Sequence, residues 1–275
     1  MSTGVLFVMS IVAGLIGAVT GTGGGVVLIP LLTSVGIDIK QAIAMSILSV
    51  IAISNSAASQ YVRRHVPNLR VSTYLELFAV LGSLGGASLT VMSSRRPLFF
   101  LCGGIILVCG VVLWWRQKQS WQPGGDQDAL SKQLVFEGSY YDEVEKRTIA
   151  YRGHHALLGG SLMLGTGVIS GWLGVGSSAL TVLVHDLVIG LPPKVSLTTS
   201  NLTIGVMALA GACVYLEAGL IDPRLAVPVL LGASLGALMG SKLLLGLTNQ
   251  VARAVFLGLL LVFGIEMVVH GIMRP

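Results

Sequence analysis

Two glycine-rich stretches combine the residue types and the spacing that suit anion binding. Residues 21–25 read Gly-Thr-Gly-Gly-Gly and residues 174–178 read Gly-Val-Gly-Ser-Ser, and both interrupt long apolar segments. Glycine disfavours helix by about 1 kcal/mol relative to alanine, so each segment should break there. A half-helix restarting after the break presents free N–H groups and its positive dipole end. We therefore predict an anion site at Gly23, Gly24, Gly25, Gly176, Ser177 and Ser178.

Polar side chains also gather where the next apolar segment of each half begins. In the second half they are unusually dense between positions 194 and 203, and a sparser set occupies positions 40–55. Hydroxyl groups are common in membrane helices, where they often bond back to their own backbone. An anion bound by neutral donors could also be released again, as transport requires. We add these members of the two sets to the predicted site: Lys40, Ser46, Lys194, Thr199, Ser200 and Asn201.

Three ionisable residues lie deep within apolar segments and are candidates for proton coupling. His185 and Asp186 fall near the end of the second glycine-broken segment, and Glu266 lies inside the last apolar segment. Ionisable groups at membrane depth are functional candidates by default. We favour His185 and Asp186, because they follow the half-helix that starts at the second break.

The composition is that of a membrane protein, and neither the motifs nor the placement of the basic residues indicates an enzyme or a nucleic-acid binder. Hydrophobic residues make up 53% of the 275 residues, charged residues only 11%, and the mean hydropathy is +0.85. The net charge of +5 comes from basic residues in short loops, the positive-inside pattern of membrane proteins. Catalytic motifs such as H-E-x-x-H or a P-loop are absent. Cys102, Cys109 and Cys213 have no metal-binding spacing, so we expect no metal and no cofactor.

The pattern of apolar segments predicts an all-α polytopic membrane protein built from two four-segment repeats. Residues 1–115 form the first membrane repeat, 116–152 a polar cytoplasmic loop with a short amphipathic helix around 141–149, and 153–275 the second repeat. An offset of 154 pairs glycines, lysines and tyrosines of the two halves, for example Tyr61 with Tyr215 (215 minus 61). This offset stays constant from the pair Gly36 and Gly190 to the pair Gly110 and Gly264, which indicates an internal duplication.

The first segment of each repeat is too long for one straight crossing. A single helix over residues 4–35 would measure about 48 Å, against a hydrocarbon core of about 30 Å. We expect about eight transmembrane helices, with the first helix of each half broken at its glycines and crossing once. The alternative is that each broken segment is a re-entrant hairpin, which makes the two repeats inverted. Charge bias puts the central loop in the cytoplasm in both cases, whereas the C-terminus lies outside only in the second.

These features together resemble the TauE/SafE sulfite exporter family, also called the toluene-sulfonate uptake permease family. The resemblance lies in a glycine-rich motif, an apolar run, a lysine and a serine in each half. They occupy residues 17–30 with Lys40 and Ser46, and residues 171–178 with Lys194 and Ser200. The second half departs from the family in having Ser177-Ser178 in place of further glycines, and in having His185-Asp186 near the family's proline-rich turn. The resemblance implies a multi-pass permease for sulfite, sulfonates, sulfoacetate or related anions.

We therefore expect a secondary transporter in the cell (inner) membrane, working as an exporter, with one site between the two repeats. Its expected partners are a small anion, the proton as coupling ion and the lipid bilayer, with a homodimer as one option and no nucleic acid. The competing hypothesis is a non-transporting membrane protein, an assembly factor or a sensor that uses the central loop.

Overall fold

The computed structural model describes residues 3–20, 23–94, 127–142, 146–174 and 176–245, with scattered positions between 98 and 111 and between 254 and 269. Within these residues, five helices are long and apolar enough to cross a membrane. They are α3 (Ile39–Arg63), α4 (Leu69–Met92), α7 (Ala156–Leu173), α9 (Pro193–Glu217) and α10 (Pro223–Leu245). The described part of the bundle also contains α1 (Thr3–Thr20), α2 (Gly25–Ser34) and α8 (Gly176–Leu183). The predicted helical multi-pass membrane protein is thereby confirmed, whereas the eight crossings stay a prediction.

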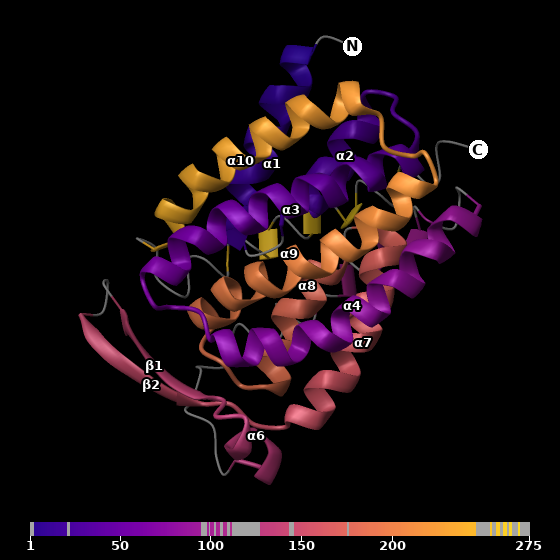
Figure 1. Ribbon diagram of the computed structural model, residues 1–275. Coiled ribbons are helices and arrows are strands. Elements are labelled where there is room, and N and C mark those ends of the chain that lie inside the picture. The colour runs from indigo at the N-terminus through magenta and orange to yellow at the C-terminus, as the bar shows by residue number, and fades with distance from the viewer. Residues whose placement is uncertain are drawn as a thin grey trace.

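The long helices form one bundle (Figure 1), and its outward faces are apolar. Large aliphatic side chains of α4 and α10 are exposed there, including Leu77, Leu81 and Leu231. Inside the bundle, the first half of α9 buries a run of hydroxyl and amide side chains. A surface that is apolar outside and partly polar inside is the arrangement expected of a bundle surrounded by lipid.

The glycine breaks reverse the direction of the chain. Gly23, Gly24 and Gly174 have positive φ angles of 64°, 74° and 68°, in the left-handed region that glycine adopts without a steric penalty. After the first break the chain lies against α1, since a Cβ on Gly24 would be 2.7 Å from the carbonyl oxygen of Ala13. These breaks are therefore turns and not merely weak points in a continuous helix.

The second broken segment forms a complete hairpin. It rises as α7, turns at Gly174 and returns as α8 followed by a short π-helix over Val184–Val188. At its base the amide of His154 donates to the carbonyl of Ile189 at 3.0 Å. A segment whose two ends are hydrogen-bonded to each other favours the re-entrant hairpin over a single crossing for residues 154–192. Length and hydropathy could not reveal this, because a hairpin and a steeply tilted helix have the same apolar content.

Helices of the two halves pack together in matched pairs. α1 packs against α10 and α4 against α7, while α3 and α9 meet in the centre, with α3 also contacting α10 and α9 contacting α4. Each outer pair runs parallel: Gly232, Gly236 and Gly240 of α10 meet the backbone of Phe7, Ile11 and Leu15 in that order. The central helices α3 and α9 each hold 25 residues, and their first residues are 154 positions apart (193 minus 39).

A pair of buried tyrosines holds the two hairpins in equivalent ways. Tyr61 of α3 donates its hydroxyl proton to the carbonyl of Ala18 near the end of α1, at 2.8 Å. Tyr215 of α9 donates likewise to the carbonyl of Gly171 near the end of α7. Each bond satisfies a carbonyl at a helix end that has no partner within its own helix. The ascending limb of each hairpin is thus fixed to a central helix.

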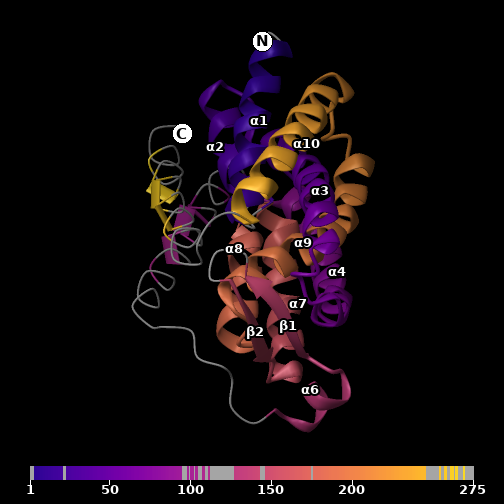
Figure 2. The same ribbon diagram turned by 90° about the vertical axis from the view of Figure 1, so that its left-hand side faces the viewer.

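The polar insert between the two halves folds at one end of the bundle, opposite the N-terminal end (Figures 1 and 2). It contains α6 (Ala129–Gln133) and the antiparallel strands β1 (Glu137–Asp142) and β2 (Arg147–Arg152). The helix expected around 141–149 is therefore wrong. Tyr140 and Asp142 of β1 are buried whereas Tyr141 between them is exposed, an alternation of period two that belongs to a strand.

The helix packing generates a test with an internal control. A Cβ on Gly86 of α4 would overlap the carbonyl oxygen of Val168 in α7, whereas one on neighbouring Gly85 meets nothing within 4 Å. Both replacements by alanine raise helix propensity equally. We expect Gly86→Ala to cost about 1–3 kcal/mol through overpacking, and Gly85→Ala to be neutral or stabilising. Melting temperatures in detergent measure both, and equal shifts in the two variants would contradict this packing.

Candidate functional site

The turns of the two hairpins meet in the interior of the bundle. A Cβ on Gly25, the first residue of α2, would lie 2.6 Å from the carbonyl oxygen of Gly174 at the other turn. No side chain caps the N-terminus of α2, whose N-cap residue is Gly24. Gly23, Gly24 and Gly25 are all buried. The first glycine cluster and the second turn, which are distant in the sequence, therefore form one buried contact.

The central helices supply the walls around this contact, here called the hairpin junction (Gly23, Gly24, Gly25 and Gly174). Val50 and Ile53 of α3 and Ile204 of α9 pack against Gly23 and Gly24. On the other side, Ile43 and Ser46 of α3 pack against Gly174. The junction is thus bounded by one helix from each half, and its lining is mainly aliphatic with a hydroxyl at Ser46.

Ser46 is the predicted site residue that the structure brings to the junction. Its buried hydroxyl lies 2.9 Å from the carbonyl oxygen of Ile43 and 3.4 Å from that of Gly174. Ser200, its counterpart at the 154 offset, donates to the carbonyl of Leu197 at 2.9 Å. Both hydroxyls therefore bond to backbone carbonyls in this conformation. Donation to an anion requires a side-chain rotation, which a hydroxyl can make at small cost.

Two buried polar atoms on the central helices have no hydrogen-bond partner in the described part of the chain. They are Oδ1 of Asn201 and Oγ of Ser54. The amide nitrogen of Asn201 donates to the carbonyl of Leu197 at 3.0 Å, and Ser54 lies beside Gly205 of α9. Leaving a buried polar atom unpaired typically costs about 1–3 kcal/mol, so both atoms are suited to meeting a ligand or water. Asn201 was predicted as a site residue, whereas Ser54 was not.

The sequence did contain a signal for Ser54. Gly205 is an isolated glycine inside the continuous helix α9, and such a glycine often marks the close approach of a neighbouring helix. Ser54 of α3 is the residue that lies against Gly205.

The structure places three predicted site residues at helix ends and away from the hairpin junction. Lys40 donates to the carbonyl of Val91 at 2.9 Å and so satisfies the end of α4. Lys194 forms a buried ion pair with Asp142 of β1, with its Nζ 3.4 Å from each carboxylate oxygen. Thr199 accepts a hydrogen bond from the amide of Asn68 at 3.0 Å, next to the start of α4. Each of these contacts is explained by helix-end or interhelical pairing.

Gly176, Ser177 and Ser178 begin α8, at the position expected for the second half-helix. The side chains of Ser177 and Ser178 lie outside the described part of the structure, as does Glu266. The predicted hydroxyl donors at the start of α8 therefore stay predictions. Among the described residues, no group of three or more His, Cys, Asp and Glu side chains is placed to hold a metal ion.

His185 and Asp186 lie in the π-helix on the descending limb of the second hairpin, and both are buried. Neither ring nitrogen of His185 has a hydrogen-bond partner in the described residues. The pair follows Gly176 by nine positions (185 minus 176), which is about 13 Å of helix rise. It therefore lies nearer the base of the hairpin than the hairpin junction.

The base of the second hairpin carries a second histidine. The ring of His154 lies against Gly190. Burial, and then the neighbouring His155, lower the pKa of His154 below its usual value. Both effects favour the neutral form of this imidazole.

Comparison with known proteins identifies relatives along nearly the whole chain. Residues 6–267 match the family model described as sulfite exporter TauE/SafE. The chain is 27% identical to the probable membrane transporter protein YdhB of Bacillus subtilis over 266 residues, covering 94% of this chain and 98% of the relative. It is also 23% identical to the probable membrane transporter protein YfcA of Escherichia coli K12, covering 91% and 83%. No solved structure gives a significant match.

The names of these relatives indicate a membrane transporter and not an enzyme. The residues that match the family model include all five long helices, the whole second hairpin and all of the first hairpin except the start of α1. The family model covers well over half of the chain, and this chain therefore belongs to the TauE/SafE sulfite exporter family.

Proposed function

We propose that this protein is a secondary transporter that exports small sulfur-containing or organic anions, such as sulfite, sulfonates or sulfoacetate, across the cell membrane. Membership of the TauE/SafE family supports the substrate class. The observation that carries the proposal is the hairpin junction, where the start of α2 meets the turn that precedes α8. Helix N-termini inside a membrane bundle favour an anion through free N–H groups and a positive dipole end.

We infer further that residues 1–115 and 153–275 are inverted repeats, each with one re-entrant hairpin. Two contacts favour this over eight crossings. His154 bonds to Ile189 at the base of the second hairpin, and Lys194 pairs with Asp142 of the central insert. With eight crossings, Lys194 would face the side opposite that insert. Pairs of half-helices in two inverted repeats are a recurrent design for a substrate site at mid-membrane.

The substrate contacts proposed at the junction are backbone N–H groups supplemented by neutral side chains. Gly23, Gly24 and Gly25 let the start of α2 pack closely against its neighbours, because a Cβ on each would meet another part of the protein. Ser46 lies at the junction, while Ser54 and Asn201 contribute buried polar groups on the walls. No described cation lies at the junction, and binding by dipoles without an ion pair suits a carrier that must release its substrate.

The topology can be tested by finding the side of the membrane from which cysteines placed in loops react with an impermeant reagent. Ala218 lies in the exposed loop between α9 and α10, and His65 in the loop between α3 and α4. In a cysteine-free background, Ala218→Cys should react with an impermeant maleimide only from outside the cell and His65→Cys only from the cytoplasm. With eight crossings both positions face the cytoplasm, so cytoplasmic labelling of Ala218→Cys would reject the inverted arrangement.

The anion site can be tested by adding bulk at the hairpin junction. Gly24→Leu should abolish the rise in melting temperature that sulfite or sulfoacetate causes in detergent, because a side chain there meets Ala13 and Ile53 and displaces the start of α2. A saturating ligand at 100 times its Kd stabilises by about 2.7 kcal/mol. Gly165→Leu is the size-matched control, since a Cβ there meets nothing within 4 Å. Normal ligand stabilisation of a folded Gly24→Leu protein would show that the anion binds elsewhere.

Coupling to protons can be tested in liposomes with an imposed pH gradient. We propose His185 and Asp186 as the coupling groups and Glu266 as the second candidate. Asp186→Asn should remove the stimulation of anion flux by the gradient while leaving downhill flux. If stimulated flux survives in both Asp186→Asn and Glu266→Gln, the carboxylates are not the coupling groups. Absence of any flux in the wild type would favour the assembly factor or sensor instead.

A further inference from the structure

A large open pocket lies between the β-hairpin of the insert and the start of α4, separate from the hairpin junction. Its volume is about 830 Å³, within the range of small-molecule sites. We call it the cytoplasmic pocket, and its main polar and aromatic lining is Arg70, Glu137, Ser139, Tyr151 and Arg152. The inference below rests on the proposed function for two points only: the side of the membrane that the pocket faces, and the class of anion present on that side.

The charges that line the pocket are not neutralised by one another. Arg70 and Arg152 form no ion pair with any residue in the described part of the chain. Glu137 is the cross-strand neighbour of Arg152 in the register of β1 and β2, yet the two groups do not approach within ion-pair distance. Two guanidinium groups against one carboxylate leave the pocket with a net positive charge. Guanidinium groups bind carboxylate, sulfonate or phosphate oxygens through paired N–H donors.

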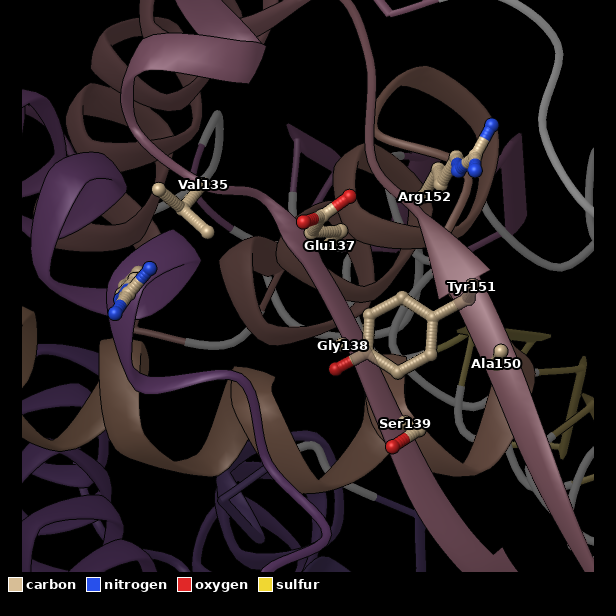
Figure 3. A pocket seen from close by; sticks show the side chains of 8 residues that line it. Val135, Glu137, Gly138, Ser139, Ala150, Tyr151 and Arg152 are labelled. Atoms are coloured by element: carbon tan, nitrogen blue, oxygen red, sulfur yellow. The ribbon is translucent and has the colours of Figure 1, made fainter.

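The wall of the pocket is shaped by an aromatic ring. Tyr151 lies across Gly138 of the neighbouring strand, as Figure 3 shows, and a Cβ on Gly138 would be 2.6 Å from the tyrosine hydroxyl oxygen. Burial raises the pKa of Tyr151, although the hydrogen bond from Asn68 acts against this rise. The phenol is therefore uncharged at physiological pH. The ring and the side chains of Val135 and Ala150 offer an apolar surface to the organic part of a ligand.

A hydrogen-bonded chain connects this wall to the transmembrane helices. The amide nitrogen of Asn68 donates to the hydroxyl of Tyr151 at 3.3 Å, and the carboxamide oxygen of the same residue caps α4 by accepting from Val71. The backbone amide of Asn68 donates to the hydroxyl of Thr199 in α9 at 3.0 Å. Asn68 thus joins the pocket wall, the start of α4 and the polar part of α9 through three hydrogen bonds.

We propose that the cytoplasmic pocket is a second anion site, which binds a small organic anion through Arg70 and Arg152 and transmits its occupancy to α4 and α9 through Tyr151 and Asn68. The oxyanion lies against the guanidinium groups and the organic part against the tyrosine ring. The same chemistry would accept a free anion or an anionic lipid headgroup, because the pocket borders the membrane end of α4.

The binding half of the proposal is tested by protection of a cysteine in the pocket. Ser139→Cys is placed in a background with Cys102, Cys109 and Cys213 replaced by alanine, and its maleimide labelling is followed in detergent. Sulfoacetate and inorganic phosphate are the probes, against sodium chloride at equal ionic strength. We expect at least one probe to slow labelling about fivefold or more. Arg70→Gln or Arg152→Gln should raise the probe concentration that gives half of the maximal protection about tenfold, as expected for loss of a charged hydrogen bond. Lys132→Gln, on exposed α6, should not change it.

Further arms separate the two sources of anion and separate this site from the hairpin junction. Protection that appears only in nanodiscs containing anionic lipid identifies a headgroup as the ligand and supports the same chemistry. Gly24→Leu should leave the protection of Ser139→Cys intact. Loss of the anion site at the hairpin junction and loss of the anion site in the cytoplasmic pocket are therefore distinguishable. Absence of protection in detergent and in nanodiscs overturns the proposal. Protection that is unchanged in both arginine variants overturns it as well.

The coupling half is tested with Tyr151→Phe, which removes only the hydroxyl. The variant should retain protection of Ser139→Cys. In the wild type the bound anion should slow hydrogen exchange in a peptide covering residues 66–72 about threefold or more. In Tyr151→Phe this slowing should disappear. Equal slowing in both proteins would contradict transmission through Tyr151, and so would its absence in a wild type that shows protection.

Discussion

The constraint on which this structure depends is that backbone within a membrane must find its hydrogen-bond partners inside the protein. Two chain reversals at the hairpin junction would each leave peptide groups exposed to lipid. The bundle avoids this by placing the reversals against each other, Gly25 against Gly174, and by enclosing them between α3 and α9. The carbonyls of Ala18 and Gly171, near the ends of the ascending limbs, are satisfied by Tyr61 and Tyr215. The remaining backbone N–H groups at the turns are the ones that we propose for anion binding.

Glycine is required at the junction for two distinct reasons. Gly23, Gly24 and Gly174 provide the left-handed conformation that a reversal needs. Gly25 provides the close approach, since a side chain there would meet the backbone of the opposite turn. The long outer helices use glycine differently, to bring α4 against α7 and α10 against α1 within a lipid environment where small residues drive packing. The same residue type therefore serves chain reversal in the centre and helix assembly at the periphery.

Much of the architecture could be predicted from the sequence, because its signals are local. The apolar segments, the glycine breaks and the 154-residue offset depend only on composition and spacing. The path of the broken segments could not be predicted, because the hydrogen bond between His154 and Ile189 joins residues whose proximity no local pattern records. The contacts of Lys40 and Lys194 could not be predicted for a similar reason. A lysine at a helix start can reach a ligand, a helix end or an acidic partner, and the distant groups Val91 and Asp142 decide between these.

The two halves also differ at equivalent positions, and this difference has an energetic consequence. Lys40 meets a backbone carbonyl, whereas Lys194 is held by a carboxylate from the insert, in an ion pair that is buried on both sides. Removing one partner of such a pair typically costs about 3–5 kcal/mol, because it leaves a buried charge uncompensated. The insert is therefore joined to the start of α9 by a contact that the equivalent position of α3 does not have. Although the first residues of α3 and α9 are 154 positions apart (193 minus 39), the start of α9 depends for its stability on a segment outside the bundle, and the start of α3 depends on α4.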